Sequence, residues 1–189
     1  MTYVLLAVLI VIAIWVIGAY NGLIALKNQV VNAWKQIDVQ LKRRHDLIPN
    51  LVNTVKGYMQ FEQATLEAVI SARNKAVSAT GVAATAKAEG ELTQALGRLF
   101  ALSENYPELK SSQNVLQLQE ELTSTENKVG FARQLYNDVA TQYNTRQAQF
   151  PTTLVAGLAK ASPAELWEIE DSAERGVPRV DLSFGKPAA

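Results

Sequence analysis

The stretch VLLAVLIVIAIWVIGAYNGLIAL, residues 4–26, decides how this chain is built. It contains no Asp, Glu, Lys, Arg or His, and fourteen of its twenty-three residues are Val, Leu or Ile. About 20 apolar helical residues cross the ~30 Å hydrocarbon core of a bilayer, so the stretch is long enough to span a membrane. Central aliphatic residues contribute roughly −0.3 to −0.6 kcal/mol each, which favours insertion by about 4–8 kcal/mol. We therefore expect residues 1–26 to form an N-terminal transmembrane anchor.

The alternative to an anchor is a cleaved signal peptide, which needs a basic region before the apolar run and a small-residue cleavage site after it. No Lys or Arg precedes the run, which is also longer than a typical signal core. The pattern therefore predicts a retained signal anchor. Basic residues lie only after the span, and the positive-inside rule then places the N-terminus outside and the following domain in the cytoplasm. The opposite orientation stays open because few charges lie close to the span.

Three residues of the span are candidates for helix packing in the membrane. Gly18 and Gly22 form a small-xxx-small pair, which allows two helices to approach closely, and Trp15 lies away from the interface that Trp prefers. The alternative is that the glycines are incidental and Trp15 faces lipid. Just beyond the span, Lys27 and Lys35 are candidates for contact with the membrane surface, because screening leaves charges effective over only ~8–10 Å.

The rest of the chain has the apolar period of helices and no β-pattern of substance. Apolar residues recur at helical spacing from Leu23 to Ile48 without Gly or Pro, so the anchor is expected to run directly into the first helix of a bundle. Pro49 is expected to end or kink that helix, and Asp46 could cap a new one. The fold prediction is all-α: one transmembrane helix continuing into an antiparallel bundle over residues 27–160.

Later elements follow from the same period and from capping residues. We expect a second helix around 52–76, a turn near Gly81 within the Ala- and Gly-rich stretch 78–90, and a helix over 91–103. The clearest pattern is heptad-like and predicts a coiled-coil type helix over 112–149. The capping box that starts at Ser162 predicts a short acidic helix over 161–175, followed by an extended or disordered tail over 176–189.

Glu62 and Arg73 interrupt an apolar stripe, where a charge is costly unless it is paired. The candidates for polar pairing between helices are Arg43, Glu62, Arg73, Glu120 and Arg133, and the alternative for Glu120 is a solvated edge. The single histidine, His45, could be a pH sensor or a general base, but a surface or capped residue at a helix end is the interpretation we favour.

The composition excludes several kinds of chemistry. The 189 residues include no Cys and one His, so thiolate sites, disulfides and multi-histidine metal sites are excluded. Eighteen basic and eighteen acidic residues cancel, which argues against a nucleic-acid binder. No phosphate-binding glycine loop or nucleophile motif is present, so we expect no catalytic residue, no metal, no cofactor and no small-molecule substrate.

Ordered sequence blocks carry a family resemblance over nearly the whole chain. They are YN at 20–21, RRHDLIPNLV at 43–52, VKGY at 55–58, AR at 72–73, SENYP at 103–107, LQLQEEL at 116–122, TEN at 125–127, FAR at 131–133, YN at 136–137 and 143–144, and FP at 150–151. The chain thus resembles the LemA family of bacterial membrane proteins. The resemblance implies a short outward N-terminus, one membrane helix in the bacterial inner membrane and a cytoplasmic antiparallel helical bundle, with no established reaction. The family often carries a His after the GY block, where this chain has Gln60 or Phe61, so a metal is disfavoured further.

These observations predict a non-enzymatic scaffold or interaction protein anchored in the lipid bilayer, which forms a homo-oligomer through the membrane. The alternative is an adaptor or regulatory subunit of a membrane protein partner, such as an envelope quality-control protease. An enzyme of another kind would need a polar cleft built from the seam residues Glu62, Arg73, Glu120 or Arg133.

Overall fold

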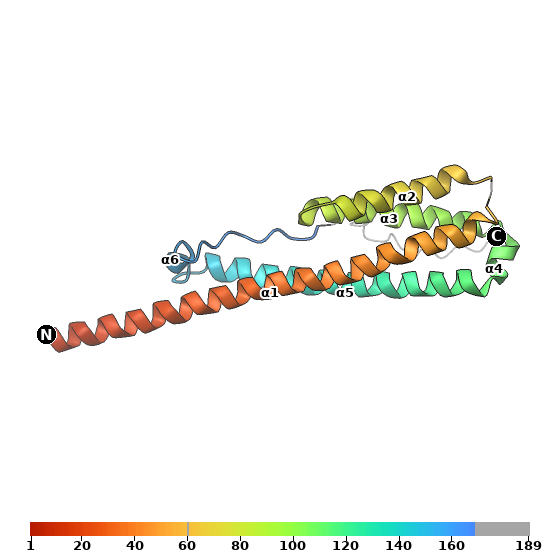
Figure 1. Ribbon diagram of the computed structural model, residues 1–189. Coiled ribbons are helices and arrows are strands. Elements are labelled where there is room, and N and C mark those ends of the chain that lie inside the picture. Colours follow the sequence, from red (N-terminus) through yellow and green to blue (C-terminus); the bar gives the residue numbers. More distant parts are fainter. Residues whose placement is uncertain (60, 169–189) are drawn as a thin grey trace, which may run out of the picture.

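The computed structural model describes residues 1–59 and 61–168, and over these the chain is helical without a β-strand (Figure 1). The all-α prediction is therefore confirmed. The helices in chain order are α1 (Thr2–Lys56), α2 (Gln63–Ser78), α3 (Val82–Ser103), α4 (Pro107–Ser111), α5 (Gln113–Ala148) and α6 (Thr153–Ala156). Helices α1 and α5 run antiparallel along each other, and the α2–α3 hairpin covers only the half of this pair that is remote from the N-terminus (Figure 1).

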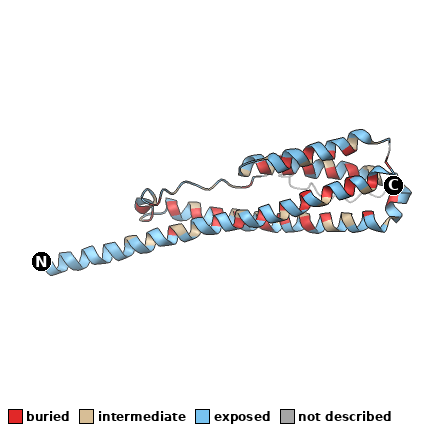
Figure 2. Ribbon diagram, viewed as in Figure 1, coloured by how far each residue is buried: buried red, intermediate tan, exposed pale blue. Residues whose placement is uncertain are grey.

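Helix α1 has two parts with different surroundings. Residues 2–22 contain no buried side chain on any face of the helix (Figure 2). The first buried residue is Leu23, and from Val30 to Val55 a buried stripe recurs at spacings of three or four residues. Because α1 is one uninterrupted helix of 55 residues, the apolar segment continues into the bundle without a joint.

Helix α1 also passes through Pro49 and ends only at Lys56. Of the two outcomes expected at Pro49, an end of the helix with a new cap at Asp46 is therefore wrong, and a kink within one helix stays a prediction. Proline lacks the N–H that would bond the carbonyl four residues earlier. In this structure Arg73 Nε of α2 donates to that carbonyl, the main-chain oxygen of His45, at 3.0 Å. A partner from another helix therefore satisfies the acceptor that Pro49 leaves free.

The interior divides into two apolar clusters along the long axis. The far cluster joins α1, α2, α3, α4 and α5, and includes Ile48, Met59, Leu92 and Leu99. The cluster nearer the N-terminus joins mainly α1 and α5 and is closed by the chain that follows α6, including Ala159 and Trp167. The second half of the bundle is thus essentially a helix pair with a peptide segment laid on it.

Two helix boundaries differ from expectation. The second helix, expected around 52–76, begins only at Gln63, because the residues up to Lys56 belong to α1. Helix α3 begins at Val82 rather than 91, so the turn predicted near Gly81 is confined to residues 79–81. Alanine-rich sequence is a strong helix former, and Gly90 lies on the exposed side of the helix, where glycine is tolerated at about 1 kcal/mol. Gly81 sits before α3 with φ +87°, a backbone conformation that favours glycine.

The short acidic helix predicted over 161–175 does not begin at its capping box. Residues 161–168 form no helix, and 169–175 and the tail 176–189 lie outside the described residues. The local capping signal is overridden because side chains of α5 bind the backbone of Ala164 and Trp167. Helix α5 itself, Gln113–Ala148, closely matches the predicted 112–149.

Candidate functional site

The N-terminal part of α1 is an apolar helix with no protein around it. Its most apolar window of 18 residues has a mean hydropathy of 2.7, and none of that window is buried inside the protein. By length and composition the helix can cross a membrane. Trp15 is 38% exposed, and no atom lies within 4 Å of a Cβ placed on Gly18 or Gly22. All three predicted packing residues therefore lie on a surface that is open to lipid or to another helix.

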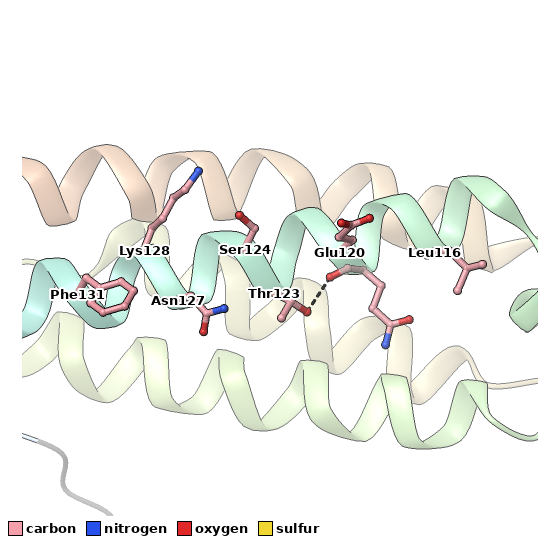
Figure 3. Close-up of a pocket in the computed structure, with 8 residues that line it drawn as sticks. Leu116, Glu120, Thr123, Ser124, Asn127, Lys128 and Phe131 are labelled. Atoms are coloured by element: carbon pink, nitrogen blue, oxygen red, sulfur yellow. Dashed lines mark hydrogen bonds between the residues drawn. The ribbon is translucent and has the colours of Figure 1, made fainter.

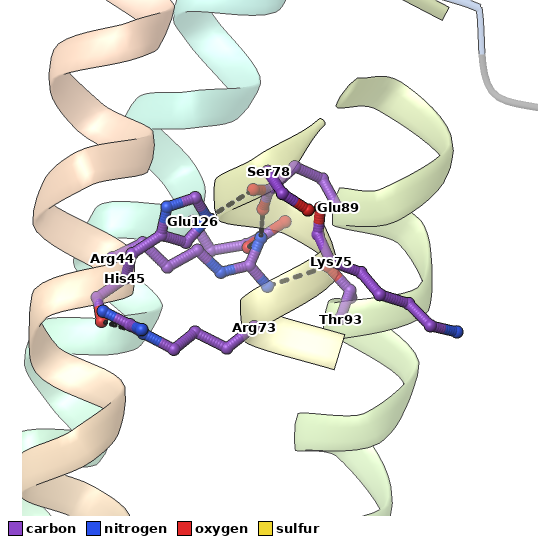
Figure 4. A network of polar contacts seen from close by, with 8 residues as sticks. All are labelled: Arg44, His45, Arg73, Lys75, Ser78, Glu89, Thr93 and Glu126. Atoms are coloured by element: carbon purple, nitrogen blue, oxygen red, sulfur yellow. Dashed lines mark hydrogen bonds and ion pairs between the residues drawn. The ribbon is translucent and has the colours of Figure 1, made fainter. Parts of the chain in front are cut away.

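Farther along, a buried polar cluster joins α1, α3 and α5 (Figure 4). Arg44 Nη1 donates to Glu89 Oε2 at 3.0 Å and Arg44 Nη2 donates to Thr93 Oγ1 at 2.8 Å. His45 Nε2 lies 2.6 Å from the other oxygen of Glu89. Arg44 and Glu89 are only 3% and 2% exposed, so both charges are withdrawn from water and satisfied within the cluster.

The third helix enters this cluster through Glu126 of α5. Its Oε2 lies 2.9 Å from Arg44 Nη1 without hydrogen-bond geometry, so the contact is an ion pair. The Glu126 side chain is 37% exposed, which places this edge of the cluster at the surface. The Arg44 guanidinium of α1 thus contacts two carboxylates and a hydroxyl from α3 and α5. Removing a partner would leave a buried charge uncompensated, so this cluster, which we call the polar clamp, holds the three helices together.

The interpretation of His45 as a surface or helix-end residue was wrong. It is 8% exposed and lies eleven residues before the end of α1. Sequence reasoning also missed Glu89 and Glu126, the carboxylates that Arg44 and His45 contact. For Arg44 and His45 a signal was present, since both fall three or four residues from the buried Leu41 and Ile48.

The five predicted pairing residues do not meet in one place. Arg73 bonds the His45 carbonyl on α1, as described above. Glu62 accepts a hydrogen bond at 3.2 Å from the Tyr106 hydroxyl, whose pKa is raised by burial and by that carboxylate. Arg133 stacks its guanidinium 5.7 Å from the centre of the Trp167 ring. Arg43 and Glu120 are exposed.

The side of the α1–α5 pair that no other described element covers is an open apolar face. It has two shallow grooves that share Lys128 and Phe131. One, of about 500 Å³, lies beside Val39 and Leu135. The other, of about 660 Å³, runs along α5 (Figure 3). Phe131 is 73% exposed and Val39 64% exposed, which is unusual for side chains of this size in the middle of a bundle. Lys35, predicted to contact the membrane surface, is exposed and lines the first groove, and Lys27 is exposed nearer the apolar segment.

None of these places has the composition of a catalytic or metal centre. Among the described residues, no three His, Asp or Glu side chains gather where they could hold a metal ion. The buried cluster is closed by its own contacts, and the open grooves are lined mainly by amide, hydroxyl and apolar side chains. The open grooves are suited to packing against another helix.

Comparison with known proteins places the chain in a family. The model of the LemA family matches residues 33–182. A protein of Metamycoplasma hominis named Protein LemA is 29% identical over 168 residues, which cover 88% of this chain and 74% of that protein. Two proteins of Paramagnetospirillum magneticum, named Magnetosome protein MamQ 2 and MamQ 1, are each 22% identical over 175 residues; the match covers 79% of this chain and 64% of each of them, less than two thirds of their length. Because the family match spans most of the chain, from within α1 to beyond α6, the chain belongs to the LemA family.

Proposed function

We propose that this chain is a non-enzymatic interaction scaffold, anchored in the bacterial inner membrane by the first part of α1 and self-associating there. The observation that carries the proposal is the continuity of α1, which joins an exposed apolar span directly to a buried bundle stripe. A rigid connection of this kind gives every copy the same tilt and height relative to the bilayer. Copies confined to one plane in one orientation then present the same side surfaces to each other.

The surface proposed for self-association is the open apolar face, namely Val39, Lys128, Phe131 and Leu135 with the flanking Lys35. A symmetric contact places the same patch of each copy together. An exposed aromatic ring at the centre of such a patch is the type of residue that dominates interface energies. In the membrane, Gly18 and Gly22 would extend the same contact by allowing close approach of two α1 helices.

Analytical ultracentrifugation of the detergent-solubilised full chain tests this assembly. We expect an oligomer for the wild type and smaller species for Phe131→Glu and for Gly22→Leu. Phe61→Glu is the matched control, because Phe61 is 96% exposed but lies in the connection between α1 and α2. A monomeric wild type, or equal assembly of all variants, would count against self-association through these surfaces.

The proposed topology has the N-terminus outside and the bundle in the cytoplasm, with the span retained. Because the chain has no Cys, single cysteines report the side unambiguously. In intact spheroplasts a membrane-impermeant maleimide should label Thr2→Cys and should label Ser111→Cys only after lysis. The reverse pattern would assign the bundle to the outer side, and a mature chain that lacks the first residues would exclude an anchor.

An adaptor for another membrane protein is the second candidate, and the same open face would serve it. The relatives' names, Protein LemA and Magnetosome protein MamQ, state no reaction. Crosslinking in native membranes followed by mass spectrometry separates the two functions. Crosslinks through Lys35 and Lys128 to a second copy support the scaffold, whereas crosslinks from these lysines to one other membrane protein support the adaptor.

A further inference from the structure

The chain that follows α5 forms the end of the bundle nearest the apolar segment, and its outer side is apolar (Figure 1). We call residues 149–159, which include α6, the tip. Phe150, Leu154 and Leu158 recur every four residues and are 80%, 67% and 71% exposed. Val155 and Ala159 of the tip are buried. The inner side of the tip therefore packs within the protein, whereas its outer side groups three large apolar side chains, as interaction sites do.

The tip carries no charge, and the residues that flank it are basic. No Asp, Glu, Lys, Arg or His occurs over residues 147–159. Arg146 and Lys160 stand on either side of this run, and both are exposed. Lys27 of α1, about one turn beyond Leu23, is exposed as well. Apolar side chains bordered by basic ones are typical of elements that lie in the interface of a membrane, between the acyl chains and the lipid phosphates.

The tip packs on α1 at the place where this helix leaves the bundle (Figure 1). Leu23 of α1 shares an apolar cluster with Ala159 of the tip, although Leu23 still belongs to the charge-free run of the sequence. Before Leu23 only Val16 and Ala19 are partly shielded, and they lie seven and four residues earlier on the same face of the helix. The tip and the charge-free run therefore overlap along the axis of α1.

The tyrosines of α1 indicate which level of a membrane this overlap occupies. Tyrosine is enriched at the two membrane interfaces, and Tyr3 and Tyr20 are 90% and 40% exposed. Seventeen residues separate them, a rise of about 26 Å at ~1.5 Å per residue, against a hydrocarbon core of ~30 Å. Leu23, which clusters with the tip, follows Tyr20 by three residues. The tip therefore lies at the level of the second interface.

Tilting of α1 does not carry the tip away from a bilayer. Packed helices lie about 10 Å apart, and at an average tilt of ~20° a group at that distance shifts along the membrane normal by only about 3 Å. The headgroup layer on each side of the hydrocarbon core is about 5–7 Å thick. The outer side chains of the tip thus stay within this layer, where they leave water by entering among the acyl chains.

We propose that the tip is a second membrane contact, in which Phe150, Leu154 and Leu158 insert between the lipids of the leaflet from which α1 enters the bundle. The partner is the lipid surface, and the flanking basic side chains meet its phosphates. This inference rests on the membrane anchor proposed above. A single membrane helix can turn about its own axis, but the tip lies on one side of α1. Its insertion therefore fixes that rotation and, with it, the direction in which the open apolar face points.

Accessibility of a spin label in vesicles of phosphatidylcholine and phosphatidylglycerol tests the contact in the full chain, which has no native Cys. The label on Leu158→Cys meets oxygen, which concentrates among acyl chains, and a water-soluble nickel chelate, which does not enter them. We expect its ratio of oxygen to nickel collisions to exceed that of Phe61→Cys several-fold, because Phe61 is 96% exposed in the connection between α1 and α2. Ile12→Cys, at a position 50% exposed in the apolar segment, is the reference for lipid.

The three labels separate failure of the tip contact from failure of the anchor. If Ile12→Cys reports lipid and Leu158→Cys reports water, the tip contact is overturned and the anchor stands. Shielding of Leu158→Cys from both reagents would mean that protein covers the tip, which also overturns the proposal. If Ile12→Cys itself reports water, the anchor fails and the tip contact fails with it. Sedimentation of Phe131→Glu tests self-association independently, because Phe131 lies outside the tip.

A charge on the outer side of the tip provides a second measurement. Leu154→Asp places a carboxylate at the membrane interface and should lower the oxygen-to-nickel ratio of the label on Leu158→Cys several-fold. Val77→Asp is the matched control, because Val77 is 54% exposed on α2, in the half of the bundle remote from the apolar segment. Equal ratios in these two variants would overturn the insertion of the tip.

Discussion

The contact between Arg73 and the carbonyl that Pro49 leaves free predicts a measurable coupling between two helices. Pro49 cannot donate to the His45 carbonyl, and Arg73 Nε supplies the missing hydrogen bond at 3.0 Å. His45 is 8% exposed, so without Arg73 water has little access to the residue. A buried acceptor that loses its partner costs about 1–3 kcal/mol.

We therefore expect Arg73→Met, which keeps most of the packing of the side-chain stem, to destabilise the bundle by about 1–3 kcal/mol. In the background Pro49→Ala, the new N–H supplies the helical bond and Arg73→Met should cost about 1–2 kcal/mol less. Pro49→Ala alone should stabilise the chain by about 2–3 kcal/mol, because proline is the least favourable residue in a helix interior.

Urea unfolding of the detergent-solubilised full chain, followed by the fluorescence of the bundle tryptophans, measures this cycle. Trp15→Phe in every variant removes the signal of the apolar segment. Arg98→Met is the control, because Arg98 is exposed on α3 and its change is expected to stay within about 0.5 kcal/mol. Equal costs of Arg73→Met in the two backgrounds, within about 0.5 kcal/mol, would refute the explanation of how α1 tolerates its proline.

Three further substitutions test other parts of the structure. Glu89→Ala removes the carboxylate that the buried Arg44 and His45 side chains share, and it should lower the free energy of unfolding in urea by about 3 kcal/mol. Glu91→Ala is the control: it breaks only the exposed pair with Lys75 and should cost less than about 1 kcal/mol. Gly81→Ala should destabilise by about 1–2 kcal/mol through its φ of +87° alone, since nothing lies within 4 Å of the new Cβ; Gly90→Ala, inside a helix, should instead stabilise by about 0.5–1 kcal/mol. Burial, and then a nearby carboxylate, raise the pKa of Tyr136 above its ordinary 10.0, so its contribution is present below pH 10 and is lost as the pH rises through the raised folded value; Tyr136→Phe should flatten the alkaline fall of the urea midpoint.

The sequence predicts best where one local pattern decides the structure. The heptads of α5 predict that helix nearly to the residue, and the apolar period of α1 from Leu23 onward predicts its buried face although not its end. The family was also recognisable from ordered blocks along these helices. In each case the information lies within a few turns of a single helix.

Sequence-based prediction failed where a residue far away in the sequence determines the local structure. The helix continues through Pro49 because Arg73, on another helix, bonds the freed carbonyl. The capping box at 162–165 forms no helix because the asparagines at 137 and 144 bind that backbone instead. Glu89 was hidden because the alanine-rich start of α3 has no apolar period to mark its buried side. The spacing of residues along one helix cannot reveal contacts that come from another part of the chain.

The two halves of the α1–α5 pair are covered unequally, and the less covered half is the place where a partner would bind. The α2–α3 hairpin and the polar clamp around Arg44 reinforce only the half of the α1–α5 pair farther from the apolar segment (Figure 1). Arg44 lies about 32 Å along α1 from Leu23, the first buried residue, at ~1.5 Å per residue. Over that interval one side of the pair is closed by the peptide segment that ends in Trp167, and the other exposes Phe131. The open face proposed for self-association therefore lies in the less reinforced half, next to the apolar segment, where anchored copies would be held side by side.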